Sequence, residues 1–219
     1  MGMSNIACTH SPHVVFAQDT FAFLIGINAE WNQGRNVVGD EALFHALKET
    51  YKIPSDRICF VKDEKATKQY VIKELESLLQ KTTPNSTFFF YYGGHGNPKS
   101  FQTIEEASTH LELCQIFKNF RGELVWFVID CCYSGNFYES VKATFDREND
   151  ENDSENKNDC VRACIMSTQL NQVAGGEWTL TECWIHAIQG GLLAKLATSC
   201  CLRMELFIDY ASDKTAQVK

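Results

Sequence analysis

Residues Thr87–Gly96 read TFFFYYGGHG: an apolar run, a pair of glycines, one histidine and a third glycine. The run is apolar at consecutive positions, so a strand built from it would be covered on both of its faces. Strands of this kind are typical of parallel sheets that lie between layers of helices. The glycines let the backbone turn sharply where the strand ends and hold the imidazole of His95 at the edge of the sheet. A tight turn whose histidine only makes a local hydrogen bond is the alternative interpretation.

Similar apolar runs of strand length occur before and after this one. They are FAFLIGI (Phe21–Ile27), RICFV (Arg57–Val61), LVWFVI (Leu124–Ile129) and VRACIMS (Val161–Ser167). Segments with apolar residues at helical spacing lie between or after them, at residues 43–50, 71–79, 111–117 and 181 to about 198. This alternation predicts an α/β fold with a mainly parallel central sheet and helices on both faces.

Composition limits the classes of partner. The 219 residues suit one domain, and the net charge is −8. Residues 146–159 (DRENDENDSENKND) hold seven acids and two bases, which supply −5 of that charge, and they contain no apolar residue. We expect this run to be a solvated loop. None of the 20 Lys and Arg residues forms a run, so the sequence predicts no nucleic-acid partner. No segment is apolar over the roughly 20 residues that span a bilayer, so no membrane association is expected.

The ten cysteines lie mostly within apolar segments of a chain large enough to fold without disulfides. Reduced thiols are therefore expected, and no CxxC pair has the spacing of a zinc site. The N-terminal residues MGMSNIACTHSPH lack the charged start and apolar middle of a secretion signal. These features together predict a cytoplasmic protein.

A second motif, DCCYSG (Asp130–Gly135), directly follows the apolar run at residues 124–129. Loops at the carboxyl ends of parallel strands converge, and short right-handed crossovers favour neighbouring strands. We therefore expect His95 to lie beside Cys131 and Cys132. A thiolate next to an imidazolium is what nucleophilic catalysis by cysteine requires. Buried cysteines can also be mere packing residues, and the apolar pattern does not decide which of the two would attack.

These two blocks resemble those of metacaspases, in which an apolar strand enters Tyr-Ser-Gly-His-Gly and a later strand enters DxCxSG. LIGIN and RNVVGDEA upstream, and STQLNQVA and EWTLTECWIHAI downstream, resemble further segments of that family, so the similarity extends from about Phe21 to Tyr210. The signature QAC[RQG]G of animal caspases is not matched. The resemblance implies a caspase-like fold and a cysteine endopeptidase that cleaves after arginine or lysine and needs no cofactor.

The resemblance also assigns roles in catalysis. Cys132 corresponds to the nucleophile of DxCxSG, and Cys131 is then a packing residue. His95 corresponds to the general base and acid. The backbone N–H groups of Gly96 and Cys132 would form the oxyanion hole.

The same resemblance assigns a substrate pocket to Asp40, Asp130 and Gly93. Two carboxylates in one pocket favour a basic substrate residue. The plain alternatives are a helix N-cap for Asp40 and a strand-end turn for Asp130. Arg35 precedes Asp40 by five residues, as a basic residue does in metacaspases, although animal caspases use an arginine from this region to bind aspartate.

Three residues depart from the family pattern. Gly93 stands at the usual serine, Val37 at the usual cysteine and Tyr133 at the usual histidine. They keep open a second hypothesis, an inactive caspase-like homologue that acts as a scaffold or regulator. A flavodoxin-like nucleotide binder is a third, but LIGINAEW after the first strand offers only one glycine.

The motifs divide the chain into an N-terminal extension (1–20), a large-subunit-like part with the dyad (21–145), an acidic linker (146–159) and a small-subunit-like part of the same domain (160–219). Many metacaspases bind calcium between the two motifs. Here that interval offers only the four acids Glu105, Glu106, Glu112 and Glu123, which are too few for Ca²⁺, so no metal is expected. The acidic linker is the expected place for self-cleavage, after Arg147 or Lys157.

Overall fold

Five parallel strands form the centre of the molecule in a computed structural model that describes residues 19–27, 38–145, 160–170 and 179–189. Their order across the sheet is β2-β1-β3-β7-β8. The bounds are β1 (Thr20–Gly26), β2 (Ile58–Lys62), β3 (Thr87–Gly93), β7 (Leu124–Asp130) and β8 (Val161–Met166). The parallel sheet is confirmed, as is the expectation that β3 and β7 are neighbours. Because β8 joins the same sheet, the segments on either side of the acidic run share one core.

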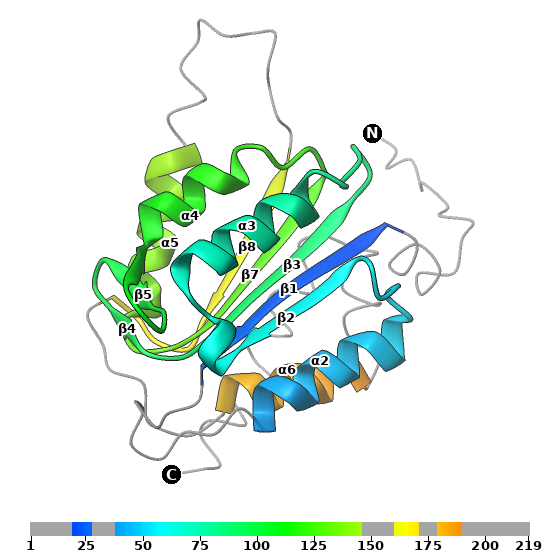
Figure 1. Ribbon diagram of the computed structural model, residues 1–219, viewed down its shortest axis with the longest axis horizontal. Coiled ribbons are helices and arrows are strands. Elements are labelled where there is room, and N and C mark those ends of the chain that lie inside the picture. The colour runs from blue at the N-terminus through cyan, green and yellow to red at the C-terminus, as the bar shows by residue number, and fades with distance from the viewer. Residues whose placement is uncertain (1–18, 28–37, 146–159, 171–178, 190–219) are drawn as a thin grey trace, which may run out of the picture.

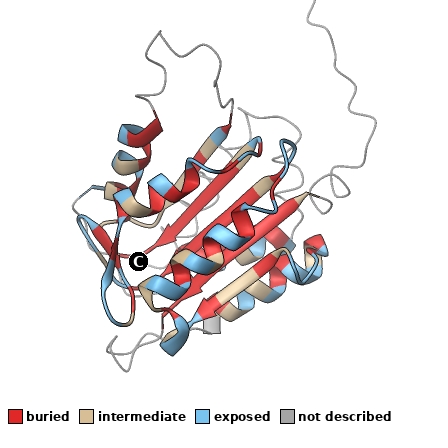
Figure 2. Cartoon of the chain, turned by 45° about the horizontal axis from the view of Figure 1, so that its top comes forward, coloured by how far each residue is buried: buried red, intermediate tan, exposed pale blue. Residues whose placement is uncertain are grey.

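Helices cover both faces of the sheet (Figure 1). One face carries α3 (Lys68–Leu79), α4 (His110–Phe117) and α5 (Ser134–Phe145), and the other carries α2 (Val38–Tyr51) and α6 (Thr179–Gln189). Successive side chains of β3 point to opposite faces of the sheet. Phe88, Phe90 and Tyr92 pack in the core beneath α3–α5. Phe89 and Tyr91 pack in the core beneath α2 and α6. The three central strands, β1, β3 and β7, are accordingly buried almost along their whole length, whereas the edge strands β2 and β8 are partly exposed (Figure 2). This explains why the strands are apolar without alternation.

A smaller antiparallel sheet lies at the carboxyl ends of the large one, beside the labels β4 and β5 in Figure 1. It consists of β4 (Gly96–Asn97), β5 (Ser100–Gln102) and β6 (Ala107–Thr109). A short 3-10 helix, η1 (Asp63–Lys65), follows β2. The sequence did not predict this sheet or helix α5.

The three central strands end at one level. Gly26 of β1 pairs with Gly93 of β3, and Gly93 pairs with Asp130 of β7. His95 and Cys132 each follow these paired residues by two positions. The register therefore brings both sequence motifs to the same edge of the sheet.

Several expectations concern residues outside the described segments. They are the acidic run 146–159, Arg35, Val37 and the helix beyond Gln189. Within the described segments, no disulfide joins the seven cysteines. No helix of this described part has the length and apolar character needed to cross a bilayer.

Candidate functional site

His95 lies between β3 and β4, with its side chain exposed. Its carbonyl oxygen accepts hydrogen bonds from the Gln102 backbone N–H (2.9 Å) and from the Tyr92 hydroxyl (2.6 Å). The same hydroxyl lies 2.8 Å from the carbonyl oxygen of Gln102. The backbone that carries the imidazole is thus fixed to the end of β3 and to β5.

An aromatic stack supports this loop from beneath. The ring of Tyr92 stacks on Phe101 at a centroid distance of 4.4 Å, and Phe101 contacts His110 (4.5 Å) and Phe137 of α5 (5.1 Å). His110 is 2% exposed, and neither ring nitrogen has a hydrogen-bond partner. Burial lowers the pKa of His110 to about 4, so this histidine is neutral at ordinary pH and acts as a flat apolar ring.

The cysteine motif forms the turn between β7 and α5. Cys131 is buried in the core layer beneath α3–α5, as predicted, whereas Cys132 is partly exposed. Tyr133 has a φ of 58°, a left-handed conformation that is uncommon for a bulky residue and reverses the chain direction at this point. Cys132 stands two residues before the start of α5, in the turn between β7 and this helix.

The loop after β8 holds this turn in place. The hydroxyls of Ser167 and Thr168 donate to the carbonyl oxygen of Cys131 at 3.2 and 3.3 Å. Thr168 and Ser134 also exchange hydrogen bonds: each backbone N–H donates to the other's hydroxyl oxygen at 2.9 Å. Sequence reasoning assigned these hydroxyls no role, although their position directly after the fifth apolar run was a usable signal.

Gly96 brings the histidine and cysteine motifs into contact. A Cβ atom at this position would stand 2.3 Å from the Cys132 carbonyl oxygen and 2.6 Å from Cys131 Sγ, closer than any side-chain carbon can approach. Only glycine allows the loop after His95 to lie directly on the cysteine turn. The structure thus places Gly96, the residue after His95, directly against the turn that carries Cys132.

The two predicted pocket carboxylates meet through two hydroxyl groups. Tyr91 Oη donates to Asp40 Oδ1 (2.5 Å) and lies 2.7 Å from Thr181 Oγ1. Thr181 donates to Asp130 Oδ2 through its hydroxyl (2.6 Å) and its backbone N–H (3.3 Å). Asp40 is 0% exposed and Asp130 is 7% exposed. Neither Tyr91 nor Thr181 was singled out from sequence, because nothing local marks them and 90 residues separate them.

Asp40, a residue of α2, lies against the end of β1, and Gly93 is the last residue of β3. Asp40 lies in the first turn of α2, and its carboxylate packs on Gly26, where a Cβ would approach Asp40 Oδ2 to 2.7 Å. Gly93 is buried and pairs with both Gly26 and Asp130. It therefore lies between Gly26, on which Asp40 packs, and Asp130.

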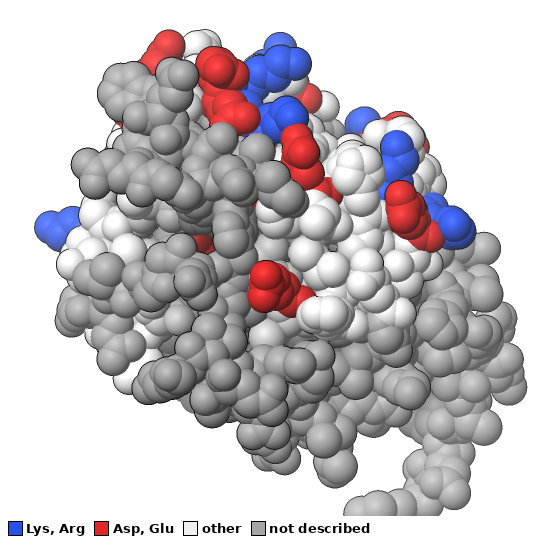
Figure 3. Space-filling view, turned by 90° about the horizontal axis from the view of Figure 1, so that it is seen from below, with Lys and Arg blue, Asp and Glu red and all other residues white. Residues whose placement is uncertain are grey.

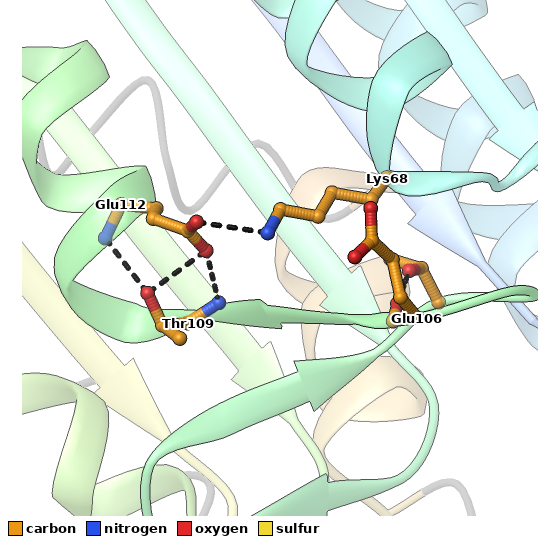
Figure 4. Close-up of polar contacts among 5 residues, drawn as sticks. Lys68, Glu106, Thr109 and Glu112 are labelled. Carbon is orange, nitrogen blue, oxygen red and sulfur yellow. Dashed lines mark hydrogen bonds and ion pairs between the residues drawn. The ribbon is translucent and has the colours of Figure 1, made fainter.

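Glu112, one of the four glutamates between the motifs, has a structural role (Figure 4). It accepts from the backbone N–H of Thr109 (2.8 Å) and forms an ion pair with Lys68 of α3 (2.8 Å), while Thr109 caps α4. The hydrogen bond from Lys68 lowers the pKa of Glu112. In the segments that the structure describes, no cluster of three or more His, Cys, Asp or Glu side chains could hold a metal ion.

Comparison with known proteins identifies the family. The sequence model described as "Caspase domain" matches residues 20–184, well over half of the chain. Among solved structures, the crystal structure of protein GSU0716 from Geobacter sulfurreducens is similar, with a TM-score of 0.54 and 15% sequence identity over 80% of this chain and 83% of that chain. At that identity the similarity concerns the fold alone. No curated protein matches the chain.

Proposed function

Because the chain belongs to the caspase-domain family of cysteine peptidases, we propose that it is a metacaspase-like endopeptidase whose catalytic dyad is His95 and Cys132. The observation that carries the proposal is the contact of Gly96 with the Cys132 turn at the shared end of β3 and β7. A histidine and a partly exposed cysteine from separate motifs are joined there by backbone packing. A fold that used these residues only for packing has no need of an exposed imidazole beside that turn.

The proposed reaction proceeds in two steps. His95 takes the thiol proton of Cys132, and the sulfur attacks the scissile carbonyl carbon; the C–N bond then breaks, and His95 gives the proton to the leaving amine. The resulting thioester is cleaved by water, which His95 deprotonates. The N–H groups of Gly96 and Cys132 stabilise the oxyanion in each step. No cofactor takes part.

The proposed substrates are proteins or peptides with arginine or lysine before the cut. Asp130 lies two residues before the nucleophile and retains a little exposed surface, so a guanidinium would meet it first, while the fully buried Asp40 would act from behind. Gly93 between them leaves room for the incoming side chain. On the face shown in Figure 3, acidic and basic side chains lie next to each other along the upper edge, which favours peptide substrates over nucleic acid. We further propose a cytoplasmic location, which the free cysteines of the described segments support.

Hydrolysis of fluorogenic peptides tests the proposal. Wild type should release the fluorophore from an arginyl peptide, whereas Cys132→Ala and His95→Ala should lose activity by at least a factor of about a thousand. Cys131→Ala is the matched control, because it removes a neighbouring thiol that lies in the core. Equal activity in wild type and Cys132→Ala would contradict the proposal and leave the inactive scaffold, which the departures at Gly93 and Tyr133 favour.

Specificity has a test of its own. Asp130→Ala should cost about 2 to 5 kcal/mol in kcat/KM for an arginyl peptide, since the guanidinium loses its charged partner. Faster cleavage after aspartate than after arginine in wild type would contradict the basic preference and point to Arg35.

A further inference from the structure

We propose that Tyr91 and Thr181 are positioning residues of the substrate pocket, which hold the carboxylates of Asp40 and Asp130 in one arrangement beside Cys132. The inference rests on the proposed function, since it assigns roles within that substrate site. Neither residue belongs to the histidine or cysteine motif.

A continuous line of polar contacts crosses the sheet edge: Asp40 of α2, Tyr91 of β3, Thr181 of α6 and Asp130 of β7. The Tyr91 hydroxyl donates to Asp40 and the Thr181 hydroxyl donates to Asp130, so each hydroxyl hydrogen is used on a carboxylate, and the two hydroxyl oxygens lie in contact with each other. Each of the three contacts between side chains is 2.7 Å or shorter. Both hydroxyl residues are buried. Hydrogen bonds to carboxylates are stronger than neutral ones, and the low local dielectric strengthens them further.

These contacts among the two carboxylates and the two hydroxyl groups would control how a basic substrate side chain is bound. Two carboxylates near each other repel, and each can turn about its own side-chain bonds unless a donor holds one of its oxygens. A guanidinium binds best when the accepting oxygens already have the spacing and plane of its N–H groups. Thr181 holds Oδ2 of Asp130 with two donors, so the orientation of this carboxylate is set before substrate arrives. The position of the scissile carbonyl relative to Cys132 follows from it.

Helix α6 thereby becomes part of the pocket. Thr181 comes after the acidic run in sequence, whereas the other three residues precede it. Its helix is anchored by Trp184, whose ring packs edge-on against Phe89 (5.5 Å) and Trp126 (5.9 Å). The pocket is complete only when the chain beyond the acidic run is docked on the sheet.

The experiment compares an arginyl peptide with the same peptide carrying citrulline, which keeps the shape of arginine without its charge. Thr181→Val removes the hydroxyl at nearly constant volume, and Tyr91→Phe does the same for the second bridge. Each should lower the ratio of kcat/KM for arginine to that for citrulline by about tenfold to a hundredfold, mainly through a higher KM for arginine. Thr181→Ser, which keeps the hydroxyl, should restore most of the ratio.

A purely structural role predicts a different result. Ile188→Ala removes apolar contacts from the buried side of the same helix and should lower the melting temperature with the ratio unchanged. If Thr181→Val does not fold, the arginine-to-citrulline ratio of kcat/KM measured for Tyr91→Phe tests the inference. An unchanged ratio in folded Thr181→Val and Tyr91→Phe overturns the inference and leaves the proposed function intact. Wild type that cleaves neither peptide overturns both.

Discussion

Tyr92 is the side chain through which the sheet holds His95. Its hydroxyl hydrogen is shared between the carbonyl oxygens of His95 and Gln102. Tyr92→Phe keeps the stacking on Phe101 but leaves both carbonyls without this donor. We expect the free energy of unfolding to fall by about 1 to 3 kcal/mol in urea titrations. If His95 is catalytic, kcat should fall as well, because the imidazole would be less well placed.

Tyr51→Phe provides the matched control for this variant. Tyr51 is a buried tyrosine of α2, packed on the opposite face of the sheet, and burial raises its pKa. Its replacement should change stability without changing kcat. A similar loss of kcat in both variants would show that Tyr92 has no particular link to His95.

His110 makes stability depend on pH. Its folded pKa of about 4 lies below the value of 6.5 for an unburied histidine, so the unfolded chain binds a proton first as the pH falls. Stability attributable to this group is complete above about pH 6.5 and decreases by about 3 kcal/mol toward pH 4. His110→Phe keeps an aromatic ring between Phe101 and Phe137 and cannot titrate. The unfolding free energy of wild type minus that of the variant should be constant above pH 7 and should fall below it; parallel curves down to pH 4 would rule this out.

At the level of elements, the small sheet β4–β6 and the cysteine turn are in direct contact. Gly96→Ala places a methyl group where the Cys132 carbonyl oxygen already lies, so β4 must move away from the turn. In the proposed mechanism the displaced N–H of Gly96 would no longer stabilise the oxyanion, and kcat should fall by about a hundredfold. Overpacking should cost about 1 to 3 kcal/mol of stability. Lys99→Ala, an exposed change in the same hairpin, is the control and should affect neither quantity; normal kcat in Gly96→Ala would disprove the role of this contact.

The long strands were predictable because they are continuous apolar runs, and helices α2, α3, α4 and α6 because their apolar residues have helical spacing. All five strands begin and end within one residue of the predicted runs. The pairing register between the strands cannot be predicted from the sequence. Helix α5 was missed because its buried face includes Ser134, Gly135 and Thr144, which do not form an apolar stripe. Strands of two or three residues, as in β4–β6, are too short to show alternation.

The candidate site was predictable only where a motif marks it. His95, Gly96 and Cys132 stand in glycine-rich turns after apolar runs, and the parallel sheet brings them together. Tyr91 looks like any other buried residue of its strand, and Thr181 like any other residue of its helix. Their link to Asp40 and Asp130 is a product of tertiary packing between four elements.

For the molecule as a whole, the two sides of the acidic run should remain together after the chain is cut. β8 pairs with β7 over six residues, and α6 packs on α2 and the sheet. We expect a protein with a specific protease site placed within residues 146–159 to elute, once cut, as a single particle the size of the intact chain. Denaturant should be needed to separate the fragments. Elution of free fragments in native buffer would show that the two parts do not hold each other through the sheet.

The pairing of β3 with β7 fixes where the two sequence motifs lie, whatever the number of residues between them. Seven paired positions locate the ends of β3 and β7 relative to each other, and β4 and β5 hold the loop that carries His95, whereas β6 and α4 lie farther along the interval between the motifs. Insertions or deletions after Gln102 would leave the ends of β3 and β7 where they are. During evolution we therefore expect the length of this later part of the interval to change more readily than the two short motifs. A search for remote relatives would gain sensitivity by scoring GGHG-like and DCCYSG-like strand ends separately, with no fixed spacing between them.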